Sequence, residues 1–266
     1  MGDDTFGQCG QGEENRQKVA PFFEVRHRTP QKVPIPEKIV KVVSGNRHCL
    51  AISEQGGLYG WGFNSMQQLS HSDDYQDPDS PSHAIFSPEK FGGELLNKFV
   101  VDAACGEEHS VVVCQMRNGE GKCTHELVYA CGNNLKGQLG INRTSHLNDW
   151  TLVEDLSEMY DGLDAEQTPL HITHIACGKR HCMATLDYGA FFFWGDNANG
   201  QLGNRKRSFI ESPFPKRKFE LNHNVVNIAC GLDSSAVIVQ SLPDRPKKKK
   251  NKRVVTLSEL ASMSDA

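Results

Sequence analysis

A short repeated pattern constrains the fold of this chain more than any other feature. An aromatic residue or Cys stands before Gly, and Gln-Leu follows seven residues after it. The copies begin at Trp61, Cys131 and Trp194, and their glutamines are Gln68, Gln138 and Gln201. Self-similarity at intervals of tens of residues is typical of proteins that stack one supersecondary unit. Function is therefore expected on a repeated surface, not in one isolated motif.

A second repeated block precedes each copy and places His three residues after Gly. Its glycines are Gly45, Gly106, Gly178 and Gly231, and its histidines are His48, His109 and His181, with Ser234 in the last copy. Equivalent residues of successive units lie apart in space, so these histidines are interpreted as structural and not as metal ligands or catalytic groups. The same structural role is predicted for the other repeated residues, which are Trp61, Gly62, Gly132, Gln138, Trp194, Gly195 and Gln201.

Residues 38–62 show how one unit reads as strands. A β-branched run at 38–43, an apolar run at 48–53 and a third run at 58–62 are separated by Gly-containing turns. Short strands with such turns favour an all-β sheet of hairpins. The step from His48 to Trp61 is 13 residues, as is that from His181 to Trp194, whereas residues 115–126 lengthen the second copy.

Two segments carry a specific resemblance: residues 100–110 (VVDAACGEEHS) and 193–203 (FWGDNANGQLG). They resemble the regulator of chromosome condensation (RCC) repeat family, and patches of similarity run from residue 1 to about Val239. The resemblance implies a β-propeller with four antiparallel strands per blade, seven-bladed in the best-known members. We expect about four blades here, over residues 1–240.

Both ends of the repeat region fall within a unit. Residues 1–10 align with 194–203, so that Met1 stands where a Trp belongs, and residues 225–239 supply the first two strands of a unit. Three interpretations follow: a remnant of a longer seven-bladed protein, a small ring closed by joining the two half-repeats, or an open arc that needs a partner. We favour an incomplete or partner-completed propeller, because four repeats fall short of seven.

The composition is ordinary for a globular protein, and no motif for enzymatic chemistry is present. Among 266 residues, 38% are hydrophobic and 23% charged, and no apolar run has the roughly 18 residues of a membrane span. No phosphate-binding loop, dinucleotide fingerprint or nucleophile elbow occurs. The nine cysteines form no C-x-x-C pair, and their repeated positions indicate small buried side chains. We expect no enzyme, no cofactor and no metal.

Charge is segregated into the predicted tail, residues 241–266. Residues 245–253 contain seven basic and no acidic residues. Taking these seven from the 29 basic residues leaves 22 against 33 acidic residues, a net charge of −11. A Lys/Arg block of this kind is typical of nuclear-import signals, with nucleic-acid contact as a less favoured alternative and a merely solvated tail as a third. Its residues are Lys247, Lys248, Lys249, Lys250, Lys252 and Arg253.

The favoured function is a non-enzymatic protein-interaction scaffold, nuclear or cytoplasmic. Its binding residues are expected in the segments that interrupt the repeat, at 70–98, 115–126 and 141–171, because loops carry function on a rigid scaffold. The alternative that the resemblance implies is a guanine-nucleotide exchange factor for a Ran-like small GTPase. Chromatin binding through the basic tail is compatible with either function.

Overall fold

The computed structural model describes residues 1–15, 26–27, 29–70, 83–145, 147–157, 171–187, 191–203, 208–215 and 223–241. These residues form three four-stranded antiparallel sheets and two two-stranded sheets, as the all-β interpretation predicts. Among them, no helix combines the length and the apolarity that a membrane crossing requires. The predicted tail at 241–266 lies outside the described residues apart from Ser241.

The first complete sheet has the order β3 (Ile39–Ser44), β4 (His48–Ser53), β5 (Leu58–Phe63) and β6 (Ala84–Lys90). The three runs read from the sequence are therefore its first three strands. The turn between β3 and β4 is closed by the Gly45 amide, which donates to the His48 carbonyl at 2.9 Å. In β4 and β5, His48 lies opposite Gly62 and Cys49 lies opposite Trp61.

The second and third sheets repeat this order along the chain. The second contains β7 (Phe99–Cys105), β8 (His109–Arg117), β9 (Cys123–Gly132) and β10 (Leu147–Leu152). The third contains β11 (Ile172–Cys177), β12 (His181–Leu186), β13 (Phe191–Gly195) and β14 (Ile210–Pro215). A register shift falls within the pairing of the first two strands of each sheet, so even this irregularity belongs to the repeat.

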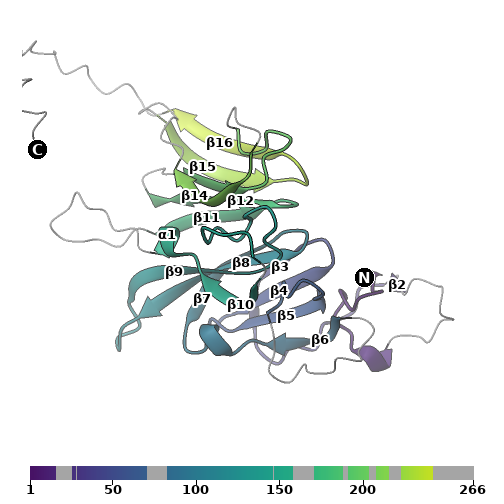
Figure 1. Cartoon of the computed structure of the whole chain (residues 1–266). Helices are drawn as coiled ribbons and strands as arrows, with labels where there is room; N and C mark the ends of the chain where they lie inside the picture. Colours follow the sequence, from purple (N-terminus) through teal and green to yellow (C-terminus); the bar gives the residue numbers. More distant parts are fainter. Residues whose placement is uncertain are drawn as a thin grey trace, which may run out of the picture.

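Among the described residues, the two half-repeats form separate sheets that do not pair with each other. The N-terminal pair is β1 (Gly2–Asp3) with β2 (Arg26–His27), and the C-terminal pair is β15 (His223–Cys230) with β16 (Ser235–Ser241). Figure 1 shows the sheets following one another in chain order, with β2 beside the first sheet and β16 at the other end. The described residues therefore form an open arc and not a ring closed by these half-repeats.

The apolar core lies between neighbouring sheets. One buried cluster joins the first and second sheets through Leu50, Trp61, Val112 and Trp150. A second, which includes Trp194, joins the second and third sheets, and a smaller one packs the third sheet against β15 and β16. Among the described residues, short helices lie in connections at η1 (Glu13–Asn15), η2 (Gly93–Leu95) and α1 (Glu154–Ser157).

Candidate interaction surfaces

The repeated histidines lie at the boundaries between neighbouring sheets, where they contact the next repeat. His48 Nε2 lies 2.9 Å from Ser110 Oγ, His109 Nε2 lies 3.1 Å from Cys182 Sγ, and His181 Nε2 lies 2.9 Å from Ser235 Oγ. In each case the partner follows the repeated His position of the next repeat, which Ser234 occupies in the last copy. We call each such set of contacts between two repeats a joint.

The glutamine of each Gln-Leu step completes the joint. The Gln138 carbonyl accepts from Trp194 Nε1 at 2.9 Å and from Cys182 Sγ at 3.4 Å. The Gln68 carbonyl accepts from Ser110 Oγ at 2.7 Å and from Cys131 Sγ at 3.3 Å. One repeat thus presents a backbone carbonyl, and an indole, a thiol or a hydroxyl of the next repeat donates a hydrogen bond to it.

The glutamine side chains hold their own turns, as the sequence predicts for this residue type. Gln68 Oε1 accepts from the Met66 amide at 3.0 Å, and Gln138 Oε1 accepts from the Lys136 amide at 2.8 Å. Gln201 Oε1 makes the same contact with the Asn199 amide at 2.9 Å. These bonds fix the turn so that the Gln carbonyl is presented to the neighbouring sheet.

A further turn residue was missed by the sequence reasoning. Asn64, Asn134 and Asn197 each accept, through Oδ1, the amide of the Leu in the Gln-Leu step, at 2.8–2.9 Å. The signal was present, because each Asn stands three residues after the aromatic or Cys position. Asp4 occupies the same position in the N-terminal half-repeat and accepts from the Cys9 amide.

The repeated Gly after the aromatic position allows a close backbone approach. Gly62, Gly132 and Gly195 have φ values of +105°, +108° and +97°. A Cβ at Gly62 would lie 2.5 Å from the Arg47 carbonyl oxygen, and equivalent clashes would occur at the other two positions. Only Gly adopts this conformation without strain while leaving that space free.

Burial keeps the joint histidines neutral. Desolvation lowers the pKa of His48 to about 4 and that of His109 to about 3, and it also lowers the pKa of His181. The Ser110 hydroxyl has one proton, which it donates to the Gln68 carbonyl. His48 Nε2 must therefore donate to Ser110 Oγ, so the proton of the neutral imidazole is on Nε2. Neutral, buried imidazoles with fixed donors support the structural interpretation of these residues.

One joint brings three candidate metal-ligand atoms together. His109, Cys177 and Cys182 offer atoms that all lie within 4.8 Å of one another. The contact between His109 and Cys182 is, however, the one that Ser110 and Ser235 make at the other two joints. Burial raises the pKa of both thiols, which opposes the thiolate form that a metal requires. The cluster is therefore explained by the joint.

The segments expected to bind partners contain more regular structure than predicted. Residues 83–98 include β6 and residues 147–157 include β10 and α1, so each segment supplies the outer strand of its sheet. Residues 115–126 are the extended tip of the β8–β9 hairpin. The structure corrects the prediction that these are irregular loops; residues 71–82 and 158–170 lie outside the described residues.

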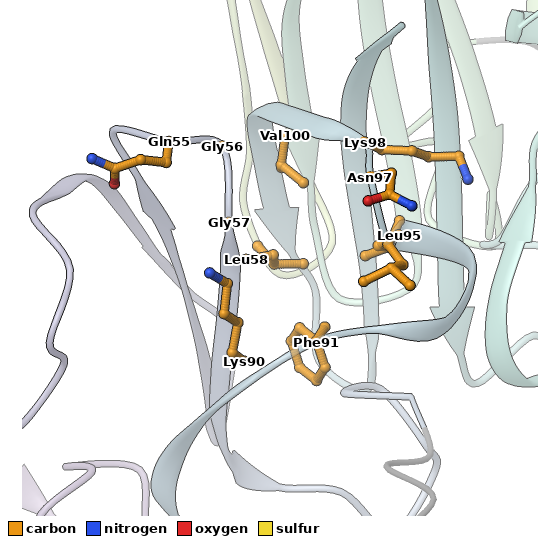
Figure 2. A pocket seen from close by; sticks show the side chains of 11 residues that line it. Gln55, Gly56, Gly57, Leu58, Lys90, Phe91, Leu95, Asn97, Lys98 and Val100 are labelled. Atoms are coloured by element: carbon orange, nitrogen blue, oxygen red, sulfur yellow. The ribbon is translucent and has the colours of Figure 1, made fainter.

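Two of the hollows that described residues line belong to the turns of the repeats. One, of about 230 Å³, lies between the β4–β5 turn and the segment that leads from β6 to β7, and Figure 2 shows Leu58, Lys90, Leu95 and Lys98 around it. The other, of about 350 Å³, lies where the first turn of each repeat meets, at Gly45, Gly106, Gly178 and Gly231. Near it, Glu107 pairs with Lys179 and Arg180 across the second joint.

Comparison with known families identifies the repeat. The model of the regulator of chromosome condensation (RCC1) repeat matches residues 1–52, 55–113, 126–185 and 188–238. The chain belongs to the RCC1-repeat family. The four matches cover both half-repeats and each complete sheet, and a second model of the same repeat matches residues 39–68.

Its relatives include much longer proteins. The chain is 28% identical to the human probable E3 ubiquitin-protein ligase HERC3, over 84% of the chain but 18% of that protein. It is also 28% identical to the human RCC1-like G exchanging factor-like protein, over 76% of the chain and 38% of that protein. The chain thus spans less than half the length of either relative, within their repeat regions.

Solved structures confirm the architecture. The crystal structure of Prp20p from Saccharomyces cerevisiae, a protein with binding properties to Gsp1p and histones, matches 91% of this chain and 51% of that chain. The TM-score is 0.62 at 19% identity. Yeast RCC1 (Prp20) bound to Kap60 gives a TM-score of 0.63, also at 19% identity. Likeness at this level of identity establishes the shared β-propeller fold.

Proposed function

We propose that this RCC1-repeat chain is a protein-interaction scaffold that performs no catalysis of its own. The observation that carries the proposal is the use of the repeated polar side chains. The joint histidines are buried and neutral, and their Nε2 atoms are engaged with the next repeat. The imidazoles that might have served catalysis thus hold neighbouring sheets together. The exposed surfaces of the sheets are then left for protein partners.

The tip of the β8–β9 hairpin breaks the repeat and is held in a defined conformation by its own contacts. Arg117 lies over the Phe99 ring, 3.3 Å from its centroid, and Asn118 Oδ1 accepts the amides of Glu120 and Lys122. Residues 117–121 are exposed. An exposed turn with a fixed conformation loses little entropy on binding, which favours a contact site.

The scaffold proposal is tested by shortening this tip. Residues 118–122 are replaced by Asn-Gly, which keeps a tight hairpin turn, and proximity labelling in cells compares the variant with the unmodified chain and with Ser208→Ala as a surface control. We expect a defined set of labelled proteins to be lost only in the shortened variant. Identical labelling by all three chains would contradict a partner site at this tip.

A second candidate is guanine-nucleotide exchange on a Ran-like small GTPase. It is favoured by the 28% identity to a relative named as an RCC1-like G exchanging factor-like protein. Exchange would act by stabilising the nucleotide-free GTPase, with no cofactor of the chain's own. Release of a fluorescent guanine nucleotide is measured across a panel of small GTPases. The candidate fails if micromolar chain accelerates release from none of them.

We further propose that residues 245–253 direct the chain to the nucleus. They lie outside the described residues, and their support is the cluster of seven basic residues. Deleting them is expected to move a fluorescent fusion from the nucleus to the cytoplasm. Unchanged localisation would contradict the import role and leave acidic partners, such as nucleic acid, as the reason for the charge.

A further inference from the structure

The three complete sheets show what the second strand of a repeat accepts at its outer edge. In the first sheet the third strand, β5, pairs with β4 so that Trp61 lies opposite Cys49 and Gly62 lies opposite His48. In the third sheet Trp194 lies opposite Cys182 and Gly195 lies opposite His181. In the second sheet Cys131 lies opposite Ser110 and Gly132 lies opposite His109. The internal ligand of this edge is therefore a step that ends in Gly, with Trp before the Gly in two of the three sheets.

Two contacts fix that step. The indole donates to the carbonyl of the preceding Gln-Leu turn, as Trp61 does to Gln8 at 3.0 Å and Trp194 does to Gln138 at 2.9 Å. The residue after the Gly donates its amide to the turn before the second strand. Phe63, Asn133 and Asp196 make this bond to the carbonyls of Arg47, Glu108 and Arg180, each at 2.8 Å.

The C-terminal half-repeat presents the same edge to solvent. β16 pairs with β15 on one side, and no strand among the described residues pairs with its other side. The Gly231 amide donates to the Ser234 carbonyl, so Ser234 faces β15. Backbone groups alternate along a strand, and those of Ser235, Val237 and Val239 therefore face the open edge.

A cavity lies beside this edge, at the position where the first and third sheets bind the indoles of Trp61 and Trp194. Its volume is about 330 Å³, and it is lined by the 199–203 turn together with Asp233, Ser235 and Val237. Gln201 in that turn occupies the repeat position of Gln8 and Gln138, whose carbonyls accept indoles. The Asp233 carbonyl occupies the position of Arg47, Glu108 and Arg180. The acceptors of the internal ligand are thus all in place.

We propose that β16 and this cavity bind an extended segment of a partner protein that contains a Trp-Gly step. The segment adds to β16 as an antiparallel strand, its indole enters the cavity beside Gln201, and its Gly lies against the 231–234 turn. Strand addition to an open sheet edge supplies backbone hydrogen bonds, and a side-chain pocket supplies the specificity. An exposed edge with apolar residues is a ready template for such pairing.

The chain's own β5 defines the probe. A fluorescein-labelled peptide with the sequence of residues 57–64, preceded by three lysines for solubility, is titrated with the full chain by fluorescence anisotropy. We expect saturable binding of this peptide. The affinity should fall about tenfold or more when the Trp is replaced by Ala, or when the Gly that follows the Trp is replaced by Val, since anchoring aromatics dominate such interfaces. Equal binding of all three peptides, or no binding, overturns the proposal.

Protein variants and a cross-link locate the site. Val237→Pro removes an edge amide while leaving the β15 side of the ladder intact, and should abolish binding, whereas the exposed Ile238→Ala should bind as the unmodified chain does. A benzophenone at the peptide's Trp position should cross-link the unmodified chain within 199–203 or 233–237. Cross-links elsewhere, or self-association of the chain that excludes the peptide, would overturn the assignment.

Because the site deepens the proposed interaction function, its test is kept separate from that of the hairpin. The peptide assay needs no cellular partner and does not involve residues 115–126. If the peptide does not bind, the result for the hairpin is unaffected. If shortening the hairpin changes no labelled protein, the result for the peptide is unaffected.

Discussion

The joint between the first and second sheets and the joint between the third sheet and the half-repeat use the same contact in different surroundings. In both, His Nε2 lies 2.9 Å from a serine hydroxyl. At the first, Ser110 is buried and also bonds to Gln68. At the last, Ser235 is only partly buried. The comparison teaches that equivalent repeat positions make the same contact, and we expect the burial of the surroundings to decide how much that contact stabilises the fold.

Lowering the pH is expected to produce the largest difference in stability between the joints. The folded-state pKa values of His48 and His109 are about 4 and about 3, below the unfolded value of 6.5. Below pH 6.5 the unfolded chain therefore binds more protons, and stability falls as the pH is lowered. By pH 4 we expect a loss of roughly 3 kcal/mol per imidazole, measured by urea unfolding between pH 7 and pH 4.

Acid also protonates carboxylates, so variants supply the control. His109→Gln should remove a larger part of this pH dependence than His181→Gln, because a hydrogen bond with the Ser234 backbone, followed by the charges of Asp233 and Asp196, partly restores the pKa of His181. An unchanged slope in His109→Gln would show that carboxylates, not the joints, govern acid unfolding.

A matched pair of isoleucines gives the next largest effect. Ile52 in β4 and Ile238 in β16 hold the same repeat position, but they are 2% and 60% exposed. Ile52→Ala should lower the free energy of unfolding by about 2–5 kcal/mol through lost burial and a cavity. Ile238→Ala should change it by about 0.5 kcal/mol or less. Similar losses in urea unfolding would mean that β16 is covered in solution.

The joint serines give a smaller difference. Ser110→Ala leaves the buried donor of His48 without its acceptor, and we expect a loss of about 1–3 kcal/mol. Ser235→Ala should lower the free energy of unfolding by less, because Ser235 is only partly buried and water can replace its hydroxyl beside His181. Thermal unfolding followed by tryptophan fluorescence compares the two variants. Equal shifts of Tm would contradict the idea that the surroundings set the weight of the contact.

Cys182→Ser is expected to have the smallest effect. Serine already fills this position at Ser110 and Ser235, so the variant should keep the contact with His109 and change stability by about 1 kcal/mol or less. Cys182→Ala is the matched variant that removes the contact. If Cys182→Ser were as damaging as Cys182→Ala, the thiol would have a role beyond the joint, and the neighbouring Cys177 would be its first candidate partner.

The sequence could predict the inner strands because their signals are local. β-branched runs, Gly-containing turns and the repeated His place β3, β4 and β5 within a few residues. The outer strand of each sheet was missed, and in the first and third sheets proline is the physical reason. β6 contains Pro88 and β14 contains Pro213 and Pro215, and proline is tolerated at a sheet edge although it weakens the strand pattern.

The partners of the joint residues were beyond sequence reasoning. The contact between His48 and Ser110 spans 62 residues, and nothing local to either residue indicates the other. The repetition of both positions suggested structural importance without showing that the contact crosses between repeats. The open edge at β16 likewise depends on which strands pair, and the separation of the two half-repeats became visible only in the assembled sheets.

The identity of the joints has a consequence for how such chains change over evolutionary time. Each repeat offers a Gln carbonyl at its end and requires one from the unit before it, so its two faces are complementary to those of any other copy. Duplication or loss of one whole unit therefore recreates an interface that is already optimised. Unequal crossing-over can therefore lengthen or shorten the array without requiring a new packing interface, provided that the recombination point leaves the Gln-Leu turn intact.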